Sequence, residues 1–413
     1  MSGADMSGAD RPEQSLLHRA ATPYYLLLGA TLLLLALGLV MVFSASSVVA
    51  FKYLGSSYAI VSKQAMWLAI GLPLAWLSSR LPVRAWRALA YVGLTASVAL
   101  LCLVVISGTE VNGNKNWLEF GGPFRIQPSE LAKLALIIWG ADLLARKRRL
   151  LTQWKHLLVP LVPVGALVIG LVLLGGDLGT AIILIAILGS LLYVAGSPLR
   201  LFVAFAVPAL LVVAVMVNNR AARLSRITSW LDPSMDPQGA GWQALHGKFA
   251  LASGGWWGVG LGGSKEKWGS LPEAHTDFIF AIIGEELGLV GTVAVLVLFG
   301  LVGYAGLRVA VHAKDPFVSY ASAGVTAWIL VQALINVGAV LGILPITGVP
   351  LPLVSYGGSA LVPTMLALGM LLSFARPRPE PARRPARGAV PGRGASRPGV
   401  RGRPPVPAAR VGR

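Results

Sequence analysis

The sequence predicts an all-α integral membrane protein of about ten spanning helices. Of its 413 residues, 55% are hydrophobic and only 13% are charged, and the mean hydropathy is +0.70. A soluble globule of this length carries more charge. Several uninterrupted apolar stretches reach the roughly 20 residues that a helix needs to cross about 30 Å of hydrocarbon. No segment shows the alternation typical of barrel strands.

The predicted spans are apolar segments bounded by charged, Gly-rich or Pro-rich residues. They cover residues 24–45, 58–79, 88–107, 129–146, 157–175, 177–196, 199–217, 277–307, 318–342 and 358–376. The first span is too long for the apolar core of a cleaved signal peptide, so we expect it to remain in the protein.

Lysine and arginine are unevenly distributed between the loops that join these spans. If the N-terminus is cytoplasmic, the inner loops receive most of them: Arg80, Arg84, Arg87, Arg146, Lys147, Arg148, Arg149, Lys155, Arg200, Arg308 and Lys314. The short outer loops receive only Lys52, Lys115 and Arg125. This bias is typical of cytoplasmic loops. We therefore expect both termini to be cytoplasmic, with residues 1–22 as a short tail.

The C-terminal segment, residues 377–413, is rich in Pro, Gly, Ala and Arg. From Arg376 to Arg413 the chain contains eleven Arg and one Glu, which supply +10 of the net charge of +18. Such a composition cannot bury a core, so the segment is predicted to be a disordered cytoplasmic tail. It either attracts anionic lipids or an acidic partner, or anchors the topology. This concentration of charge argues against nucleic-acid binding.

The longest loop, residues 218–276, is predicted to be extracytoplasmic, between the seventh and eighth spans. It contains five of the twelve tryptophans, and its basic residues are Arg220, Arg223, Arg226, Lys248, Lys265 and Lys267. Tryptophan favours the headgroup zone, so we expect short segments on the outer leaflet. This surface suits a phosphate-bearing lipid, or it serves as an interfacial anchor alone.

The segment from Leu271 to Phe280 leads directly into the eighth span and carries Glu273, His275 and Asp277. A partly desolvated carboxylate there would have a raised pKa, which suits a general base near neutral pH. The start of a helix opposes that shift because its free N–H groups stabilise an anion. The alternative is that Thr276 or Asp277 simply caps the helix.

Further ionisable groups lie inside predicted spans, where they are costly and indicate function or a buried pair. Glu285 and Glu286 follow Asp277 by about two turns, and we expect at least one to pair with Arg or Lys. Glu130 and Lys133 have the i,i+3 spacing of an ion pair. Lys133 is therefore either a salt-bridge partner or a phosphate contact.

Two other segments have a structural interpretation beside a functional one. Asp177 opens the sixth span and has the position of an N-cap. Residues 348–359, which include Ser355, are too rich in Gly and Pro for a continuous helix. At membrane depth such backbone must be buried in protein or line a cavity.

Several of these segments, in this order, resemble the SEDS family (shape, elongation, division and sporulation), to which FtsW and RodA belong. The resemblance runs from about residue 24 to residue 376, and its motifs are Gln127–Lys133, Asp177–Ala181, Arg223 with Arg226, Gly254–Gly263, Leu271–Gly288 and Ile346–Gly358. One motif alone would be weak, whereas all of them in order are highly specific. The form of Pro272–Phe278 and the long basic tail are more similar to FtsW than to RodA.

The resemblance implies a peptidoglycan glycosyltransferase that polymerises lipid II, the lipid-linked disaccharide-peptide precursor, for septal wall synthesis. Asp277 matches the aspartate that is regarded as catalytic, acting as general base on the acceptor sugar 4-hydroxyl. Undecaprenyl pyrophosphate leaves, and the β-1,4 bond forms with inversion. The residues that we expect to bind pyrophosphate are Arg125, Lys133, Arg223, Arg226, Lys265 and Lys267. The supporting residues are Glu130, Asp177, Glu273, His275, Glu285, Glu286 and Ser355.

The resemblance also implies a location in the bacterial plasma membrane at the septum. The partner would be a class B penicillin-binding transpeptidase, with other division proteins. The single cysteine, Cys102, lies in an apolar span, so a Cys-based metal site is excluded. No metal-ligand spacing is visible and no cofactor is expected, although a divalent cation such as Mg²⁺ on the pyrophosphate is compatible with the sequence.

Other functions stay open at this point. A lipid II flippase would use Glu285, Glu286 and Lys133 along a translocation path. A RodA-type polymerase would act in elongation, and a non-catalytic protein would serve as a scaffold for the transpeptidase. The enzyme is favoured because the densest motif lies at the outer surface, where exported precursor is assembled.

Overall fold

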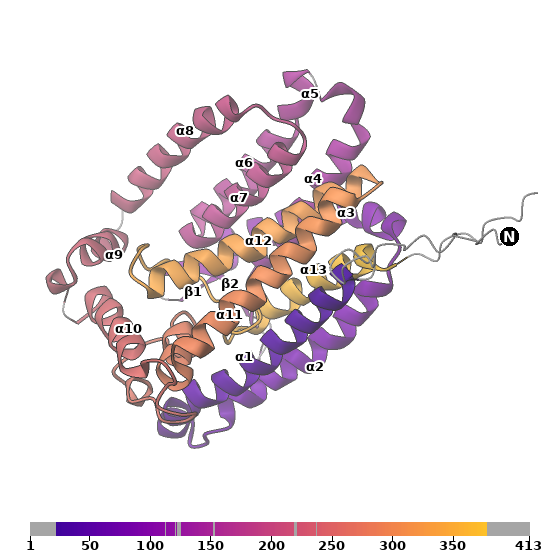
Figure 1. Ribbon diagram of the computed structural model, residues 1–413. Helices are drawn as coiled ribbons and strands as arrows, with labels where there is room; N and C mark the ends of the chain where they lie inside the picture. Colours follow the sequence, from indigo (N-terminus) through magenta and orange to yellow (C-terminus); the bar gives the residue numbers. More distant parts are fainter. Residues whose placement is uncertain are drawn as a thin grey trace, which may run out of the picture. The chain divides into compact units, whose positions relative to one another are not determined.

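The computed structural model describes residues 22–111, 113–119, 121, 125–151, 153–218, 221–236 and 238–377. Residues 1–21 and 378–413, which hold almost all of both predicted tails, lie outside these ranges. The described chain is mainly helical, which confirms the predicted fold class (Figure 1).

Each predicted span coincides with one long helix. These helices are α1 (Thr22–Leu54), α2 (Ala59–Arg80), α3 (Val83–Ser107), α4 (Pro128–Arg146), α6 (Leu161–Leu174), α7 (Leu178–Val194), α8 (Leu199–Asn218), α11 (Ile279–His312), α12 (Pro316–Val340) and α13 (Gly358–Ala375). The shorter helices are η2 (Arg148–Leu150), α5 (Trp154–Leu158), α9 (Ala221–Leu231), η3 (Pro233–Met235), α10 (Ala240–Gly254) and η4 (Glu266–Trp268).

Within the described ranges, seven helical segments are long and apolar enough to cross a membrane. They are α1, α2, α3, the segment Lys155–Leu174 that contains α6, α11, α12 and α13. Helix α4 carries buried Glu130, Lys133 and Asp142, which lower its hydropathy, and α7 has only 17 residues. The count of ten spans therefore stays a prediction.

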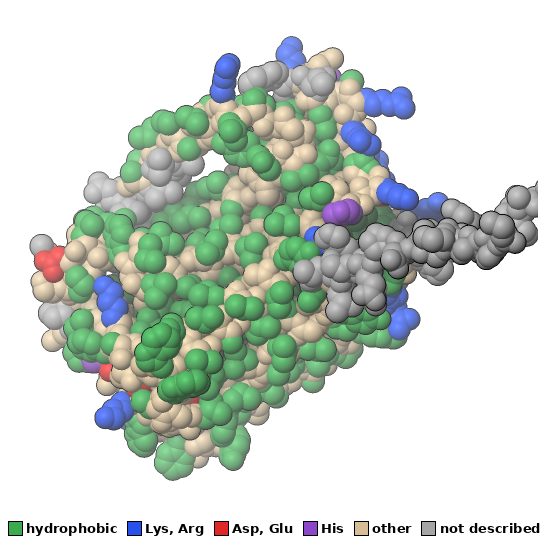
Figure 2. All heavy atoms as spheres, viewed as in Figure 1, with side chains coloured by type: hydrophobic (Ala, Val, Ile, Leu, Met, Phe, Trp, Pro, Cys, Tyr) green, Lys and Arg blue, Asp and Glu red, His purple; other side chains and the backbone are tan. Residues whose placement is uncertain are grey.

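Helix α12 lies at the centre of the bundle. In its most apolar stretch 78% of the residues are buried, against 11% in α2. Helices α4, α7 and α11 pack around α12, while α1 packs on α11 and α2 on α13 (Figure 1). On the face shown in Figure 2, hydrophobic side chains are spread over the whole surface, and most visible Lys and Arg lie toward the end that holds α5.

The connection between α3 and α4 contains a small antiparallel sheet that was not predicted. Its strands are β1 (Thr109–Val111), β2 (Asn114–Glu119) and β3 (Arg125–Ile126), in the order β1-β2-β3. Such short strands carry too few residues for a recognisable alternation. The side chain of Lys115 on β2 donates to the carbonyls of Val105 and Ile106 at 3.0 and 2.9 Å. It therefore provides a hydrogen-bond donor for carbonyls in the last turn of α3.

Helix α11 was predicted as one uninterrupted span, but it is broken at Gly288, where φ is 69° and ψ is −164°. The glycine-rich loop that follows α10 packs into this break. There the N–H groups of Val259 and Gly260 donate to the carbonyls of Glu285 and Glu286 at 2.9 and 3.1 Å. The loop thus supplies hydrogen bonds that a continuous helix would have made internally.

Candidate active site

Asp277 lies in the short segment between η4 and α11. The turn begins at Glu273, whose φ of 54° is unusual for a non-glycine residue. The Glu273 carbonyl accepts from the N–H groups of Thr276 and Phe278, both at 3.1 Å. The N-cap of α11 is Phe278, and it makes no side-chain capping bond. The interpretation of Thr276 or Asp277 as the helix cap is therefore wrong.

Three consecutive carbonyls of this segment are held from the end of α12 and from the loop between α12 and α13. The bonds are Tyr356 N–H to His275 O (3.0 Å), Ser355 Oγ–H to Thr276 O (2.6 Å) and Asn336 Nδ2–H to Asp277 O (2.8 Å). Ser355, a predicted supporting residue, thus acts on the backbone. Among the described residues, the Asp277 carboxylate has no hydrogen-bond or ion-pair partner. Hydrogen bonds hold its backbone, while no described side chain occupies its carboxylate, which is therefore available to a ligand.

Burial raises the pKa of the Asp277 carboxyl to about 7, and the negative charge of Glu273 adds to this increase while Arg226 opposes it. A carboxyl group with a pKa near 7 can accept a proton at neutral pH. Burial also lowers the pKa of the His275 imidazole, with Glu273 opposing. His275 is therefore mainly neutral at pH 7. The carboxyl environment suits a general base.

Arg226, on α9, and Asp277 both lie near Gly348 of the α12–α13 loop. A Cβ placed on Gly348 would lie 3.5 Å from Asp277 Oδ2 and 4.0 Å from Arg226 Nη1. Gly348 has a φ of +74°, a conformation that glycine adopts without steric cost. The carboxylate and the guanidinium therefore both lie within van der Waals distance of the position that a side chain would occupy at residue 348, an exposed glycine.

Glu286 forms a buried ion pair, as expected for at least one of the two adjacent glutamates. Its Oε1 lies 2.9 Å from Lys267 Nζ, and the Ser44 hydroxyl of α1 lies 2.7 Å from both carboxylate oxygens. Lys267 is buried and also donates to Ser44 at 3.1 Å. Lys267 is therefore the counterion of Glu286 and connects η4 to α1 and α11. This buried position does not support the predicted contact between Lys267 and pyrophosphate.

Glu285 holds the same loop through neutral donors. Its carboxylate accepts from the Ser264 hydroxyl at 2.5 Å and from the backbone N–H of Lys265 at 2.8 Å. The Lys265 side chain is exposed and stays a predicted phosphate ligand. Both glutamates therefore bind the loop that precedes Asp277.

Lys133 and Glu130 form the expected i,i+3 ion pair at 2.8 Å. Lys133 is fully buried, donates to Gln332 Oε1 at 3.0 Å and lies 4.8 Å from the ring centre of Trp328. Gln332 in turn donates to the carbonyl of Pro350 at 2.9 Å. Lys133 was predicted to be either a salt-bridge partner or a phosphate contact. The structure supports the first interpretation, because Lys133 pairs with Glu130 and orients Gln332 of α12.

The remaining predicted residues lie in separate places. Asp177 is the N-cap of α7, because its Oδ1 accepts from the N–H of Thr180 at 2.9 Å. Arg125 pairs with Glu119 at 2.7 Å on the small sheet. The side chain of Arg223 lies outside the described part of the structure.

Sequence reasoning missed Asn336 and Lys248. Asn336 and Gln332 are spaced i,i+4 in an otherwise apolar span, and two amides on one helix face are a signal that could have been used. Lys248 was counted among the basic residues of the long loop without a specific role. It lines a crevice with Arg226 and Trp230.

Across the ranges that the structure covers, no three His, Cys, Asp or Glu side chains are grouped to hold a metal ion. Binding of a divalent cation such as Mg²⁺ to the pyrophosphate of the substrate stays a prediction.

Residues 24–379 match the family model FtsW/RodA/SpoVE, described as cell cycle protein. The "Probable peptidoglycan glycosyltransferase FtsW" of Mycobacterium tuberculosis is 42% identical over 382 residues, covering 91% of this chain and 73% of the relative. Stage V sporulation protein E of Bacillus subtilis is 36% identical over 87% of this chain and 98% of its own length.

Two solved structures are similar over most of the chain. One is described as "Structural coordination of polymerization and crosslinking by a peptidoglycan synthase complex"; it is 31% identical, with a TM-score of 0.71 over 84% of this chain and 96% of the other. The rod shape determining protein RodA of Thermus thermophilus is 29% identical, with a TM-score of 0.64 over 85% and 96%.

Proposed function

Because this chain belongs to the FtsW/RodA/SpoVE family of cell cycle proteins, we propose that it is a peptidoglycan glycosyltransferase with Asp277 as its general base. The family and the seven apolar helices make it a multi-pass membrane protein. Its relatives named peptidoglycan glycosyltransferase FtsW are 36–42% identical, which supports the activity and a role in cell division.

The observation that carries this proposal is the state of Asp277. Its backbone carbonyl is bound by Asn336, its carboxyl has a pKa of about 7, and its carboxylate lies next to the exposed Gly348. A fixed base with a pKa near the working pH is what abstraction of a sugar hydroxyl proton requires.

The proposed reaction joins two molecules of lipid-linked precursor. Asp277 accepts the proton of the acceptor 4-hydroxyl, and the freed electron pair on that oxygen forms a bond to the anomeric carbon of the donor. The bond between that carbon and the pyrophosphate oxygen breaks, and its electrons leave with undecaprenyl pyrophosphate. Attack from the face opposite the leaving group inverts the anomeric carbon. Cations near the base stabilise the charge that develops on the leaving pyrophosphate.

We place the reaction on the extracytoplasmic side of the plasma membrane, at the division septum, with both termini in the cytoplasm. Clustering of Lys and Arg toward the end that holds α5 (Figure 2) supports this orientation. The similar synthase complex is described as coordinating polymerization and crosslinking. That description supports lipid II as substrate and a class B penicillin-binding transpeptidase as partner. Other division proteins, and a divalent cation on the pyrophosphate, are further proposals.

The test is polymerisation of lipid II by the purified protein, with and without the transpeptidase, comparing wild type with Asp277→Asn. We expect glycan strands from wild type only, while Asp277→Asn retains its thermal stability and its association with the partner. Equal polymerisation by Asp277→Asn would remove the catalytic assignment. No glycan under any condition, with lipid II still crossing vesicle membranes, would favour the flippase.

A further inference from the structure

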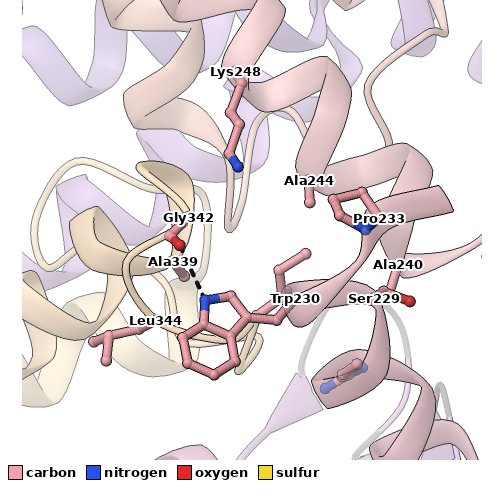
Figure 3. Close-up of a pocket in the computed structure, with 11 residues that line it drawn as sticks. Ser229, Trp230, Pro233, Ala240, Ala244, Lys248, Ala339, Gly342 and Leu344 are labelled. Atoms are coloured by element: carbon pink, nitrogen blue, oxygen red, sulfur yellow. Dashed lines mark hydrogen bonds between the residues drawn. The ribbon is translucent and has the colours of Figure 1, made fainter. Parts of the chain in front are cut away.

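A crevice lies between α9, η3, α10 and the chain that follows α12. Its lining includes Arg226, Trp230, Lys248, Ala339 and Gly342. Figure 3 shows Lys248 reaching from α10 toward Gly342, with the indole of Trp230 on the other side. The Trp230 Nε1–H donates to the Gly342 carbonyl at 3.0 Å, which ties α9 to this turn and fixes one wall.

The lysine side chain occupies space that exists because residue 342 is glycine. A Cβ at Gly342 would lie 2.6 Å from Lys248 Cε and 2.9 Å from its Nζ, so the flexible end of the lysine side chain would have to move aside. The ammonium is thus seated over the turn after α12, inside the same crevice as Arg226.

Among the residues that the structure describes, neither cation forms a direct ion pair with a carboxylate, although Arg226 lies close enough to Asp277 to lower the pKa of that carboxyl. A nearby acid, Asp236, is already used by the Ser225 hydroxyl at 2.8 Å and by the Ala240 N–H at 3.0 Å. Hydrogen bonding to Ser225 and the backbone lowers the pKa of Asp236, so it stays ionised where it is. Because the partners of Asp236 are the Ser225 hydroxyl and a backbone N–H, and no described carboxylate pairs with Lys248, the Lys248 ammonium is available to an anion.

Exposed apolar residues follow several crevice-lining residues directly along the chain. Leu231 of α9, Leu245 and Phe249 of α10, and Ile343 after α12 all expose at least 40% of their surface. A pair of cations bordered by exposed hydrocarbon fits a ligand with an anionic head and a long apolar tail better than it fits a free phosphate ion.

We propose that Lys248 and Arg226 bind the pyrophosphate of the donor, the polyprenyl-linked sugar whose pyrophosphate leaves during transfer. This inference rests on the proposed function. The donor is chosen over the acceptor because Arg226 and Asp277 converge at Gly348. The base acts on the hydroxyl that attacks the anomeric carbon, and the pyrophosphate bonded to that carbon is the nearer of the two. Arg226 contacts the phosphate next to the sugar, and Lys248 neutralises the one that carries the lipid.

The experiment measures binding, independently of turnover. Purified full-length protein in detergent micelles is titrated with undecaprenyl pyrophosphate, undecaprenol or phosphatidylglycerol, and the bound lipid is counted by native mass spectrometry. The variants are Lys248→Gln, Lys248→Arg and Gly342→Ala, and the matched control is Lys63→Gln, an exposed lysine of α2.

We expect wild type and Lys63→Gln to bind undecaprenyl pyrophosphate with equal affinity and more tightly than undecaprenol. Lys248→Gln should weaken that binding about tenfold or more, because one charge-assisted contact is lost. Lys248→Arg should restore most of it. Gly342→Ala should also weaken binding, because its methyl group displaces the ammonium while leaving the charge unchanged.

Two results would overturn the inference. Unchanged affinity of Lys248→Gln for undecaprenyl pyrophosphate would remove Lys248 from the site. An equal loss of phosphatidylglycerol binding would show a general site for anionic lipids. Both outcomes are separate from the proposed function, which fails only if wild type makes no glycan from lipid II.

Discussion

The side-chain amide of Asn336 donates to the backbone carbonyls of both Asp277 and Val349, each at 2.8 Å. One residue near the end of α12 thus connects the segment that carries the base to the loop that carries Gly348. Gln332, one turn earlier, binds Pro350 of the same loop. The position of Asp277 relative to Gly348 therefore depends on the side-chain amides of Asn336 and Gln332.

Replacing Asn336 by Leu, which has a similar shape and no donor, is expected to lower polymerisation about tenfold to a hundredfold, because small displacements of a catalytic group are costly. Each carbonyl left without a donor should also cost about 1–3 kcal/mol of stability. Thr326→Val on the same helix is the control, since its hydroxyl donates to the Ser322 carbonyl within α12 and has no other bond among the described residues. Glycan assays and thermal unfolding measure both effects. Wild-type turnover in Asn336→Leu would show that the base needs no such support.

The pH dependence of polymerisation should follow the ionisation of Asp277. The base works only when deprotonated, so the rate should rise with pH and reach half its maximum near pH 7, the pKa of this carboxyl. Glu273→Gln removes a charge that raises the pKa and should move the midpoint to lower pH. Arg226→Gln removes a charge that lowers the pKa and should move the midpoint to higher pH. Rates measured from pH 5 to pH 9 test this, and shifts in the same direction for both variants would contradict the assignment.

The sequence was sufficient to locate the helices and the segment around Asp277, because long apolar runs and a dense cluster of titratable groups are local signals. It was insufficient where a partner is distant along the chain. Lys267 was expected to be free for phosphate, yet its counterion Glu286 lies on α11 and its hydroxyl partner Ser44 on α1. The break at Gly288 was also missed, because a single glycine is common in membrane helices and its loop partner comes from residues 254–260.

The Glu286–Lys267 pair should stabilise the protein without taking part in turnover. Glu286→Leu alone leaves the ammonium of Lys267 buried without a counterion, and removing one partner of a buried pair typically costs about 3–5 kcal/mol. The double variant Glu286→Leu with Lys267→Met removes both charges and should recover most of the loss. Thermal unfolding of both variants measures this. If the double variant folds stably but makes no glycan, the result would support the predicted contact between Lys267 and the pyrophosphate of the substrate.

Gly348→Ala tests whether the space between base and guanidinium is where the reacting atoms bind. The new methyl group would lie 3.5 Å from Asp277 Oδ2 and 4.0 Å from Arg226 Nη1, and a φ of +74° adds about 1–2 kcal/mol of backbone strain. Gly196→Ala is the matched control, because Gly196 has a φ of +90° with nothing within 4 Å of its added Cβ. Both variants should lose similar stability, whereas only Gly348→Ala should lose polymerisation, by tenfold or more. Equal activity in the two variants would mean that the acceptor hydroxyl approaches Asp277 from another side.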